Sequence, residues 1–352
     1  MQNKVDITVL FSGGGGPGYP AFYKALRKST KYHARIIAGE LNPLAGNLYI
    51  DDWVDEVYRT PENTSPEFLE TMLDIVDREK ANFFLSAIDE ELALVAQNQS
   101  RFQNHGCDTL LPPEDSLECA FDKGKTGNSL KGVAAMPATV QSSPTMDLER
   151  IFDELGGGVV VKACRARGNR DNFKAHDLEE FEFYVSRLRK TNTDFLCQSF
   201  IDGDEFNVSL MLNKDGEPLY SVCRQKIDPP RTRPNTMAGL INRDKEMETI
   251  AVEVCKHMGL FPGTNNVEFL RPGDGRPLII DVNGGRHAAQ DFNLVDCGIN
   301  IPEMMIDVAR GETVSSVSDD LIPDGLLCLK YIDEYTISMT EVEKRCRVPL
   351  EP

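Results

Sequence analysis

Three oxygen-bearing side chains near the end of the chain have the spacing of a metal site. Glu268 lies in the apolar run 266–270, and Asp281 and Asn283 lie in a second run, 278–283. Alternate residues of a strand share a face, so Asp281 and Asn283 project together, and a neighbouring strand can bring Glu268 beside them. Converging carboxylate and amide oxygens suit a hard cation such as Mg²⁺ held with nucleotide phosphates. The alternative is a pair of edge strands with solvated polar residues.

The first third of the chain alternates strand-like and helix-like segments. Its short apolar runs are typical of buried parallel strands, and amphipathic stretches separate them. The strands are expected at 6–11, 34–38 and 81–86, and the helices at 21–29, 66–78 and from residue 90. This order predicts an α/β domain with a doubly wound sheet over roughly the first 110 residues.

A glycine-rich turn, residues 12–18, joins the first expected strand to the first expected helix. No Gly-Lys-Ser/Thr sequence closes it, so it is not a P-loop. Gly13, Gly15 and Gly18 have the spacing of a dinucleotide fingerprint, for which Glu40 is the nearest acidic partner. A turn that only lets the helix pack on the strand explains the glycines at least as well.

The middle of the chain changes to an α+β pattern. One strand-like run ends at Lys162 and is followed by a loop rich in Arg and Gly, and Asp215-Gly216 indicates a β-hairpin. Asp122 and Lys123 stand in a helical stretch. The expected strands are 158–162, 194–201, 205–212 and 219–226, and the expected helices are 116–131, 178–190 and 245–258.

Composition narrows the class of protein. The chain has 352 residues, of which 41% are hydrophobic and 27% charged, as in a soluble protein of two or three domains. A net charge of −18 argues against a nucleic-acid partner. The sequence has no apolar run of about 18 residues, so we expect no membrane span. The N-terminus lacks a signal-peptide pattern. Nine cysteines without CxxC spacing favour reduced thiols. We therefore expect a cytoplasmic protein without a membrane partner.

The order of these features resembles the ATP-grasp superfamily, and within it carbamoyl-phosphate-synthase-like members and carboxylate–amine ligases. The matching features are Asp122-Lys123, Lys162 and its loop, Gln198 to Glu205, Glu268, and Asp281-Val-Asn283. The resemblance implies an N-terminal Rossmann-like (pre-ATP-grasp) domain followed by a two-lobed α+β ATP-grasp fold. It implies a Rossmann-like domain at 1–113, a central lobe of linking helices and a nucleotide-covering subdomain at 114–200, and a C-terminal lobe with the metal and substrate site at 201–352.

The resemblance also implies a role for each matching residue. Lys123 and Lys162 match lysines on the phosphate side of ATP, although a solvated helix charge is the alternative for Lys123. Glu205 matches an acidic residue near the ribose or metal, with a turn residue that supports Gly203 as its alternative. The hinge strand, whose backbone pairs with adenine, corresponds to Gln198, Ser199, Phe200 and Ile201. The metal ligands correspond to Glu268, Asp281 and Asn283, with Mg²⁺, or Mn²⁺ in its place, beside ATP. The expected catalytic residues are Lys162 and Arg286.

The chain departs from the family pattern in two places. Asp281 stands where relatives usually have Glu, and two glycines displace Arg286 by one position. The loop after Lys162 has a single glycine and several arginines, which would supply charge where backbone amides usually do. These arginines are Arg165, Arg167 and Arg170. A surface or packed position explains His287 better than base catalysis does, and for Arg231 and Arg233 a substrate contact and a solvated loop are equally open.

The resemblance implies an ATP-dependent carboxylate–amine ligase. A substrate carboxylate would be phosphorylated by ATP to an acyl phosphate, and an amine, expected on an amino acid, would then form the amide and release phosphate. The expected partners are a small carboxylate and a small amine. A homodimer is also compatible with the resemblance, because members of the superfamily often form dimers. The alternatives are other acyl-phosphate chemistry, such as a carboxylate–thiol ligase or a carboxylase, and a non-catalytic nucleotide-binding regulatory module.

Overall fold

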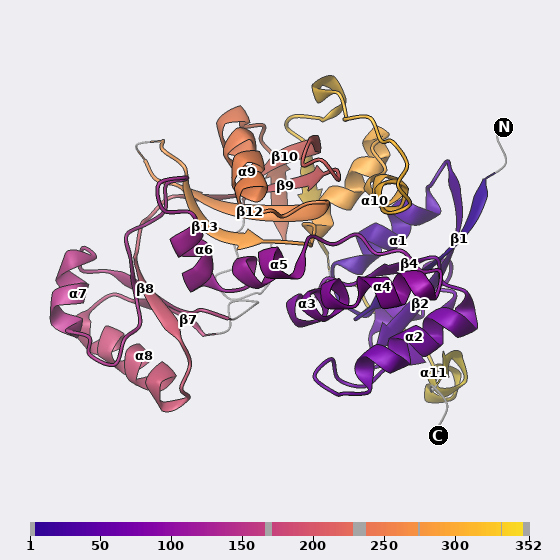
Figure 1. The fold of residues 1–352 in the computed structure, drawn as a ribbon, viewed down its shortest axis with the longest axis horizontal. Coiled ribbons are helices and arrows are strands. Elements are labelled where there is room, and N and C mark those ends of the chain that lie inside the picture. Colours follow the sequence, from indigo (N-terminus) through magenta and orange to yellow (C-terminus); the bar gives the residue numbers. More distant parts are fainter. Residues whose placement is uncertain (1–3, 166–170, 228–236, 274, 332, 348–352) are drawn as a thin grey trace.

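The chain forms three β-sheets with helices packed around them. The computed structural model describes residues 4–165, 171–227, 237–273, 275–331 and 333–347. Figure 1 shows the three parts in a row, with the four-stranded lobe at one end, the N-terminal sheet at the other and the six-stranded sheet between them.

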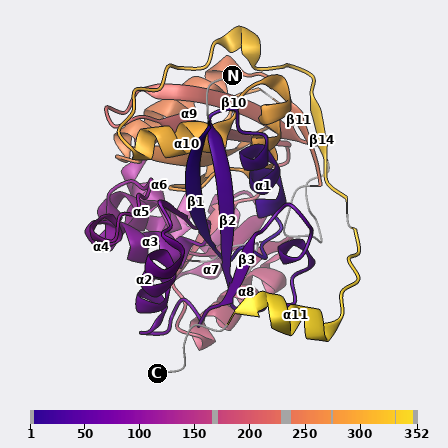
Figure 2. The same ribbon diagram turned by 90° about the vertical axis from the view of Figure 1, so that its right-hand side faces the viewer.

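The N-terminal sheet is parallel, as the sequence predicted. Its strand order is β15-β3-β2-β1-β4. Figure 2 shows α1 on one side of this sheet and α2, α3 and α4 on the other. The strands are β1 (Val5–Ser12), β2 (Tyr32–Glu40), β3 (Glu56–Arg59), β4 (Phe83–Leu85) and β15 (Cys346–Arg347). The helices are α1 (Tyr19–Arg27), α2 (Phe68–Glu79), α3 (Asp89–Gln97) and α4 (Gln99–Asn104). The sequence patterns did not predict β3 or β15.

Packing accounts for the glycine turn after β1. A Cβ on Gly14 would lie 2.7 Å from the Cβ of Ala38, and one on Gly15 would lie 2.6 Å from the Cβ of Ala45. The Gly15 amide donates a hydrogen bond of 2.8 Å to the Glu40 carboxylate. The glycines therefore let the turn lie directly against β2 and the loop that follows it.

Two short helices, and not the single helix expected at 116–131, connect the N-terminal domain to the next lobe. They are α5 (Glu114–Ala120) and α6 (Lys123–Ser129). The expectation of one helix was wrong because Asp122 ends the first and begins the second. Its backbone is extended, and its carboxylate accepts hydrogen bonds from the Gly124 and Lys125 amides as a helix N-cap.

The four-stranded lobe is antiparallel and has its own hydrophobic core. Its strand order is β5-β8-β6-β7, and α7 and α8 contribute Ile151, Phe181, Val185 and Leu188 to that core. The strands are β5 (Thr139–Gln141), β6 (Val159–Ala163), β7 (Asn172–Ala175) and β8 (Phe195–Ser199), and the helices are α7 (Leu148–Glu154) and α8 (Leu178–Lys190). Since this core is separate from the others, the lobe is attached mainly through its connecting segments.

The six-stranded sheet is antiparallel and shares two cores with the N-terminal domain. Its strand order is β13-β12-β9-β10-β11-β14. The strands are β9 (Asp204–Leu212), β10 (Pro218–Lys226), β11 (Ala238–Ile241), β12 (Gly263–Arg271), β13 (Leu278–Asn283) and β14 (Leu327–Leu329). The helices that follow its strands are α9 (Lys245–His257), α10 (Ile301–Ala309) and α11 (Met339–Arg345), and η2 (Ala289–Cys297) is a 3₁₀ segment. The domain boundaries at 113/114 and 200/201 stay a prediction.

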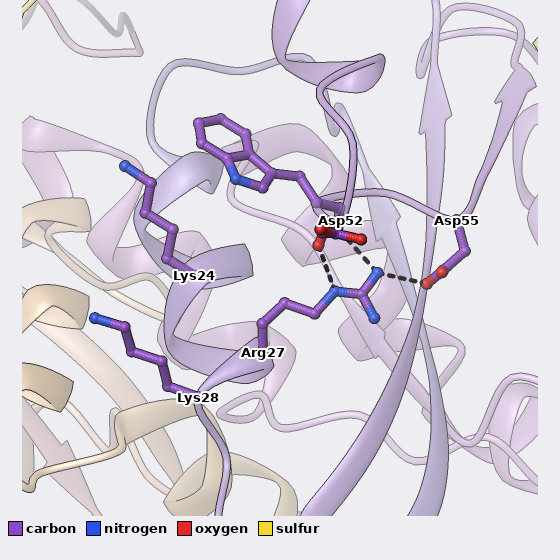
Figure 3. Close-up of a pocket in the computed structure, with 6 residues that line it drawn as sticks. Lys24, Arg27, Lys28, Asp52 and Asp55 are labelled. Carbon is purple, nitrogen blue, oxygen red and sulfur yellow. Dashed lines mark hydrogen bonds and ion pairs between the residues drawn. The ribbon is translucent and has the colours of Figure 1, made fainter.

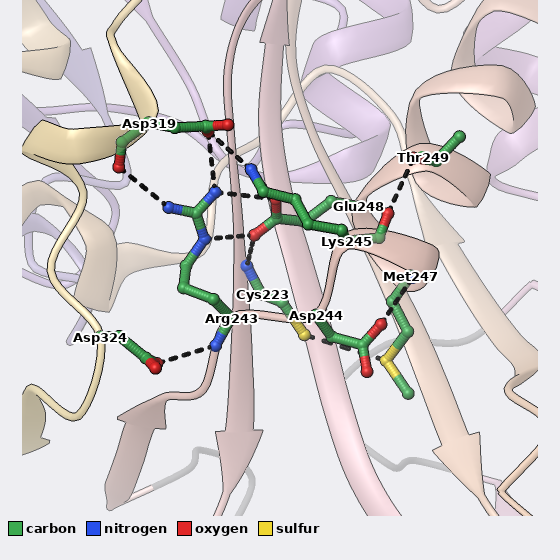
Figure 4. Close-up of polar contacts among 9 residues, drawn as sticks. All are labelled: Cys223, Arg243, Asp244, Lys245, Met247, Glu248, Thr249, Asp319 and Asp324. Carbon is green, nitrogen blue, oxygen red and sulfur yellow. Dashed lines mark hydrogen bonds and ion pairs between the residues drawn. The ribbon is translucent and has the colours of Figure 1, made fainter.

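The C-terminal segment, residues 310–331 and 333–347, runs back from the six-stranded sheet to the N-terminal sheet (Figure 2). It adds β14 to the first and β15 to the second. Figure 4 shows the polar contacts that hold Asp319 of this segment. Arg243 donates to the buried Glu248 of α9 at 2.6 Å and to Asp319 of the segment at 3.0 Å, and Lys245 reaches Asp319 at 2.6 Å. This ion cluster ties the segment to the helix that supports the six-stranded sheet.

Candidate active site

The two faces of the six-stranded sheet differ in polarity because side chains alternate along each strand. On β9, Phe206, Val208 and Leu210 face the core that α9 covers. Glu205, Asn207 and Ser209 alternate with them and lie on the other face. Asn207 and Ser209 are buried, and both donate to the Asn266 carboxamide of β12, at 2.9 and 3.3 Å. Residues on this polar face are the candidates for chemistry.

The three expected metal ligands lie beside one another on adjacent strands. In the register of β12 and β13, Glu268 is opposite Asp281 and Asn266 is opposite Asn283. Asn283 is buried, whereas Glu268 and Asp281 keep 28% of their side-chain surface exposed. The two carboxylates are therefore accessible from outside, and we refer to the space in front of them as the cleft. Among the described residues no cluster of three His, Cys, Asp or Glu forms a metal site, and this set differs because its third member is an Asn.

Lysine side chains approach these acidic groups. The Lys226 ammonium lies 2.8 Å from Glu268 and 3.4 Å from Glu205, and the Lys123 ammonium lies 3.6 Å from Asp281. Burial alone would lower the pKa of Lys226, but Glu268 and Glu205 raise it above its ordinary value. Lys123 thus lies against Asp281, with 20% of its side chain exposed, and its role on the phosphate side stays a prediction.

Lys226 was not identified from the sequence. It stands at the end of β10, and the alternation of that strand places Arg224 and Lys226 on one face. The strand pattern carries no signal for which face is functional. The pairing of β10 with β9, and of β9 with β12, brings Lys226 between the two glutamates.

Lys162 and Gln198 belong to the four-stranded lobe and contact each other. The Lys162 ammonium donates to the Gln198 carboxamide oxygen at 2.8 Å, and Gln198 donates to the Thr139 hydroxyl at 3.1 Å. Burial lowers the pKa of Lys162; Asp281 opposes this effect and Lys123 adds to it. This mutual influence places the Lys162 ammonium in the same cleft as the acidic groups of the six-stranded sheet.

The expected hinge is partly engaged within its own lobe. The Ser199 amide donates to the Ala138 carbonyl and the Phe200 amide to the Gly158 carbonyl, both at 2.9 Å. Among the described residues the Ile201 amide has no such acceptor. Within the expected hinge, Ile201 is therefore the residue whose amide is best placed to donate a hydrogen bond to a partner from outside the chain.

Arg286 reaches from the turn after β13 toward the N-terminal domain. Its guanidinium donates to the Asn283 carboxamide and lies 3.2 Å from the Asp89 carboxylate at the start of α3. A Cβ on the preceding Gly285 would lie 2.9 Å from Leu117. The glycine pair thus packs against α5, and Arg286 turns back to Asn283.

His287 is packed between aromatic groups, as the sequence reading favoured. Its Nδ1 donates to the Ala288 carbonyl at 2.7 Å, so Nε2 accepts from the Tyr220 hydroxyl, and its ring stacks on Phe292 with 4.8 Å between centroids. Burial lowers the pKa of His287, although Asp291 opposes the shift. The imidazole is therefore a neutral structural group.

The loop after Lys162 is described only at its beginning. Arg165 pairs with Glu118 and lies 3.5 Å from Asp122, so its charge is used against α5 and the cap of α6. Arg167 and Arg170 lie outside the described residues, and so do Arg231 and Arg233.

A separate surface hollow of about 420 Å³ lies on the N-terminal domain. Figure 3 shows Arg27 turned toward Asp52 and Asp55, where it donates to the Asp52 carbonyl at 2.6 Å and the Asp55 carboxylate at 2.7 Å. Lys24 lies over the Trp53 ring, and Lys28 pairs with Asp296. The charged side chains that line this hollow therefore have partners within it or beside it. None of the expected site residues lines it.

The cleft residues fit a nucleotide phosphate with Mg²⁺. The donor set consists of two carboxylates and a carboxamide, which suits a hard cation. Lys123, Lys162 and Lys226 suit phosphate oxygens. Anionic and cationic groups now neutralise each other across 2.8 to 3.6 Å, and a bound metal–phosphate pair would take over both sets of contacts.

Comparison with known proteins gives the class. The family profile described as PylC-like, N-terminal domain matches residues 11–110, and the ATP-grasp domain profile matches residues 120–287. The chain therefore has a PylC-like N-terminal domain followed by an ATP-grasp domain, and it belongs to the ATP-grasp superfamily. Members of this superfamily are ATP-dependent ligases that form carbon–nitrogen bonds, and the use of ATP and Mg²⁺ is typical of them.

Individual relatives agree with this class. The carbamoyl phosphate synthase large chain of Pyrococcus furiosus is 26% identical over 250 residues, which are 65% of this chain but only 23% of that protein. Among solved structures, the chain is similar to the biotin carboxylase domain of Hydrogenobacter thermophilus 2-oxoglutarate carboxylase, in complex with MgADP, ADP and bicarbonate. The TM-score is 0.69 at 17% identity, and the match covers 91% of this chain and 73% of that chain.

The structure of L-amino acid ligase from Bacillus licheniformis is also similar, with a TM-score of 0.64 at 15% identity. The match covers 88% of this chain and 75% of that chain. At these identities the structures show the shared fold alone. Within the described residues, no helix is long and apolar enough to cross a bilayer.

Proposed function

We propose that this protein is an ATP-dependent carboxylate–amine ligase that forms an amide bond, with an amino acid among its substrates. The observation that carries the proposal is the charge arrangement in the cleft. Three lysines from α6, β6 and β10 face the acidic ligands of β12 and β13 and the Glu205 carboxylate of β9. This combination suits a nucleoside triphosphate with a divalent cation.

The proposed reaction has two steps. A substrate carboxylate oxygen attacks the γ-phosphorus of ATP, ADP leaves, and an acyl phosphate forms. The amine nitrogen then attacks the acyl carbon, phosphate leaves, the nitrogen loses a proton to solvent, and the amide remains. Lys123 and Lys162 hold phosphate oxygens and stabilise the transferred charge. Arg286 binds the oxygens of the reacting carboxylate or acyl phosphate.

We propose that Glu268, Asp281 and Asn283 hold Mg²⁺, or Mn²⁺ in its place. When bound, the ion neutralises phosphate charge during phosphoryl transfer. Glu205 supports the same cleft through Lys226, and the hinge from Gln198 to Ile201 holds the adenine, with the Ile201 amide as its donor. The four-stranded lobe covers the nucleotide, which excludes water from the acyl phosphate.

The proposal includes a cytoplasmic location and a homodimer. All nine cysteines are free thiols in the structure, which fits a reducing compartment. The related H. thermophilus biotin carboxylase domain is described as a dimer. Light scattering after size-exclusion chromatography would test the assembly: a mass near 39.2 kDa would contradict the dimer, and twice that mass would support it.

The function is tested by ADP release with MgATP, a pool of amino acids and small carboxylic acids, and hydroxylamine as the trapping amine. We expect ADP together with an acyl hydroxamate, and subdividing the pool would identify the acid. ADP release that no acid stimulates, or ATP binding without turnover across the pool, would contradict the ligase. The first would leave an ATPase, and the second a nucleotide-binding module.

The site is tested in the same assay with Glu268→Gln, which removes a charge and keeps the shape of the side chain. We expect ADP release to fall roughly 100-fold, the usual order for losing one electrostatic contact to the reacting phosphate. Glu154→Gln, on exposed α7, is the matched control. Equal activity of the two variants would show that Glu268 is not in the site.

A further inference from the structure

A buried ion pair stands beside the candidate nucleotide cleft. Arg224 of β10 contacts Asp291 of η2, and their side chains are 2% and 0% exposed. Arg224 points from the same face of β10 as Lys226, two residues away. Across the sheet, Arg224 is opposite Asn207, which is opposite Glu268. Two strand spacings separate the backbones of Arg224 and Glu268, so this distance is about 10 Å.

The ion pair does not use all of its hydrogen-bonding groups. Among the described residues, Nε and Nη1 of Arg224 have no acceptor, and Oδ2 of Asp291 has no donor. A buried charged group normally has partners for its remaining donors and acceptors, because leaving them without partners costs free energy. The pair therefore keeps cationic donors and an anionic acceptor for a further ligand.

Among the described residues, the neighbouring ionisable side chains do not take up these donors and this acceptor. His287 lies beside Asp291 but is neutral, with both ring nitrogens engaged. Burial, and secondarily Arg224, lower the pKa of the neighbouring Lys330, while Cys328 opposes them. A Cβ on Gly239 would lie 2.7 Å from Cδ of Arg224 and 2.5 Å from Oε1 of Gln290, so β11 passes close beneath the guanidinium.

We propose that Arg224 and Asp291 form the subsite for the zwitterionic head group of an α-amino-acid substrate. The guanidinium binds the α-carboxylate and the Asp291 carboxylate binds the α-ammonium. The α-carboxylate then accepts from the unused donors of Arg224, and the α-ammonium donates to the unused oxygen of Asp291. The net charge of the pair together with the bound head group stays zero. Insertion separates two side chains that contact each other in the free protein. This subsite rests on the proposed ligase function, for which it names one substrate class.

The test is calorimetric binding to the full-length protein in saturating MgADP. The probes are the proteinogenic L-α-amino acids, one at a time, and then the decarboxylated and the deaminated analogue of the tightest. Each analogue loses one charge-assisted contact, so we expect affinity to fall roughly 10- to 100-fold. If MgADP binds but no amino acid does, or if both analogues bind as well as the amino acid, the subsite is wrong.

The variant is Arg224→Gln combined with Asp291→Asn, because removing both charges leaves no uncompensated buried ion. We expect the amino-acid affinity to fall by a similar factor while the MgADP affinity stays within about 2-fold, with Arg150→Ala on exposed α7 as the control. Unchanged amino-acid affinity in a double variant that still binds MgADP would overturn the subsite. Failure of the wild-type protein to bind MgADP would instead count against the proposed function itself.

Discussion

Single residues in the cleft are held in place by one another. Lys226 lies between Glu268 and Glu205, and Lys123 lies near Asp281. Spacing along the chain predicted that Asp281 and Asn283 share a face, because that follows from strand alternation alone. Lys226 and Arg224 could not be predicted in the same way. They alternate as any strand residues do, and their function depends on the distant strand that pairs with them.

The lowered pKa of Lys162 predicts a pH dependence for nucleotide binding. Phosphate favours the ammonium form, and in the free protein burial brings deprotonation of Lys162 to a lower pH than the ordinary value of 10.5. Above that lowered pKa, binding must take up a proton, so MgADP affinity falls as pH rises. In Lys162→Arg the side chain stays charged, and this fall should disappear.

Calorimetry of MgADP from neutral to alkaline pH, in buffers with different ionisation enthalpies, measures both the affinity and the proton uptake. The same proton uptake in the wild type and in Lys162→Arg would show that another group titrates.

At the scale of elements, the turn between β8 and β9 positions Glu205. Gly203 stands in this turn, and a Cβ there would lie 2.4 Å from the carbonyl oxygen of Arg271 on β12. Backbone cannot give way as a flexible side chain does, so only glycine fits. The sequence placed Gly203 in a turn before Glu205, and the structure supplies the reason for the glycine in the close approach of β12.

Gly203→Ala should therefore be destabilising, by about 1–3 kcal/mol, the usual cost of overpacking. It should also weaken MgADP binding, because β9 must shift and take Glu205 with it. The control is Gly273→Ala, where a Cβ would meet nothing within 4 Å. Urea unfolding and calorimetry measure the two effects. Equal stability of the two variants would mean that the turn can relax.

Local signals explain which elements could be predicted. The helix α8 (Leu178–Lys190) coincides with its expected bounds, because Asp177 caps its start and basic residues fill its last turn. Asp122 is the same kind of signal, although one continuous helix was expected across it. Short strands such as β14 and β15 have two or three residues, and their partners lie far away in the sequence. Nothing local predicts them.

At the scale of the whole molecule, the candidate site draws its residues from a large body and a small one. The N-terminal sheet and the six-stranded sheet share two cores, whereas the four-stranded lobe with Lys162 has its own. The C-terminal segment fastens the large body by adding strands to both of its sheets (Figure 2). The class of fold was predictable from the order of motifs, but the return of the chain to the first sheet was not.

The ion cluster around Arg243 gives a prediction for this large body. Glu248 is 3% exposed and receives hydrogen bonds from Arg243 at 2.6 and 2.9 Å. In Arg243→Ala the buried carboxylate loses its main partner, so unfolding free energy should fall by about 3–5 kcal/mol. Arg243→Met with Glu248→Leu should cost less, since no charge is stranded. Chemical denaturation compares them. A double variant as unstable as the single one would contradict this account.

The most direct test of the central claim follows oxygen atoms through the reaction. The acid identified by hydroxamate trapping is labelled with ¹⁸O in its carboxylate and incubated with MgATP and hydroxylamine, and the released phosphate is analysed by mass spectrometry. Activation through an acyl phosphate transfers one carboxylate oxygen to each phosphate, so we predict one ¹⁸O per phosphate formed. Phosphate without the label, released at the same rate as ADP, would show that water attacks ATP and that this cleft does not activate a carboxylate.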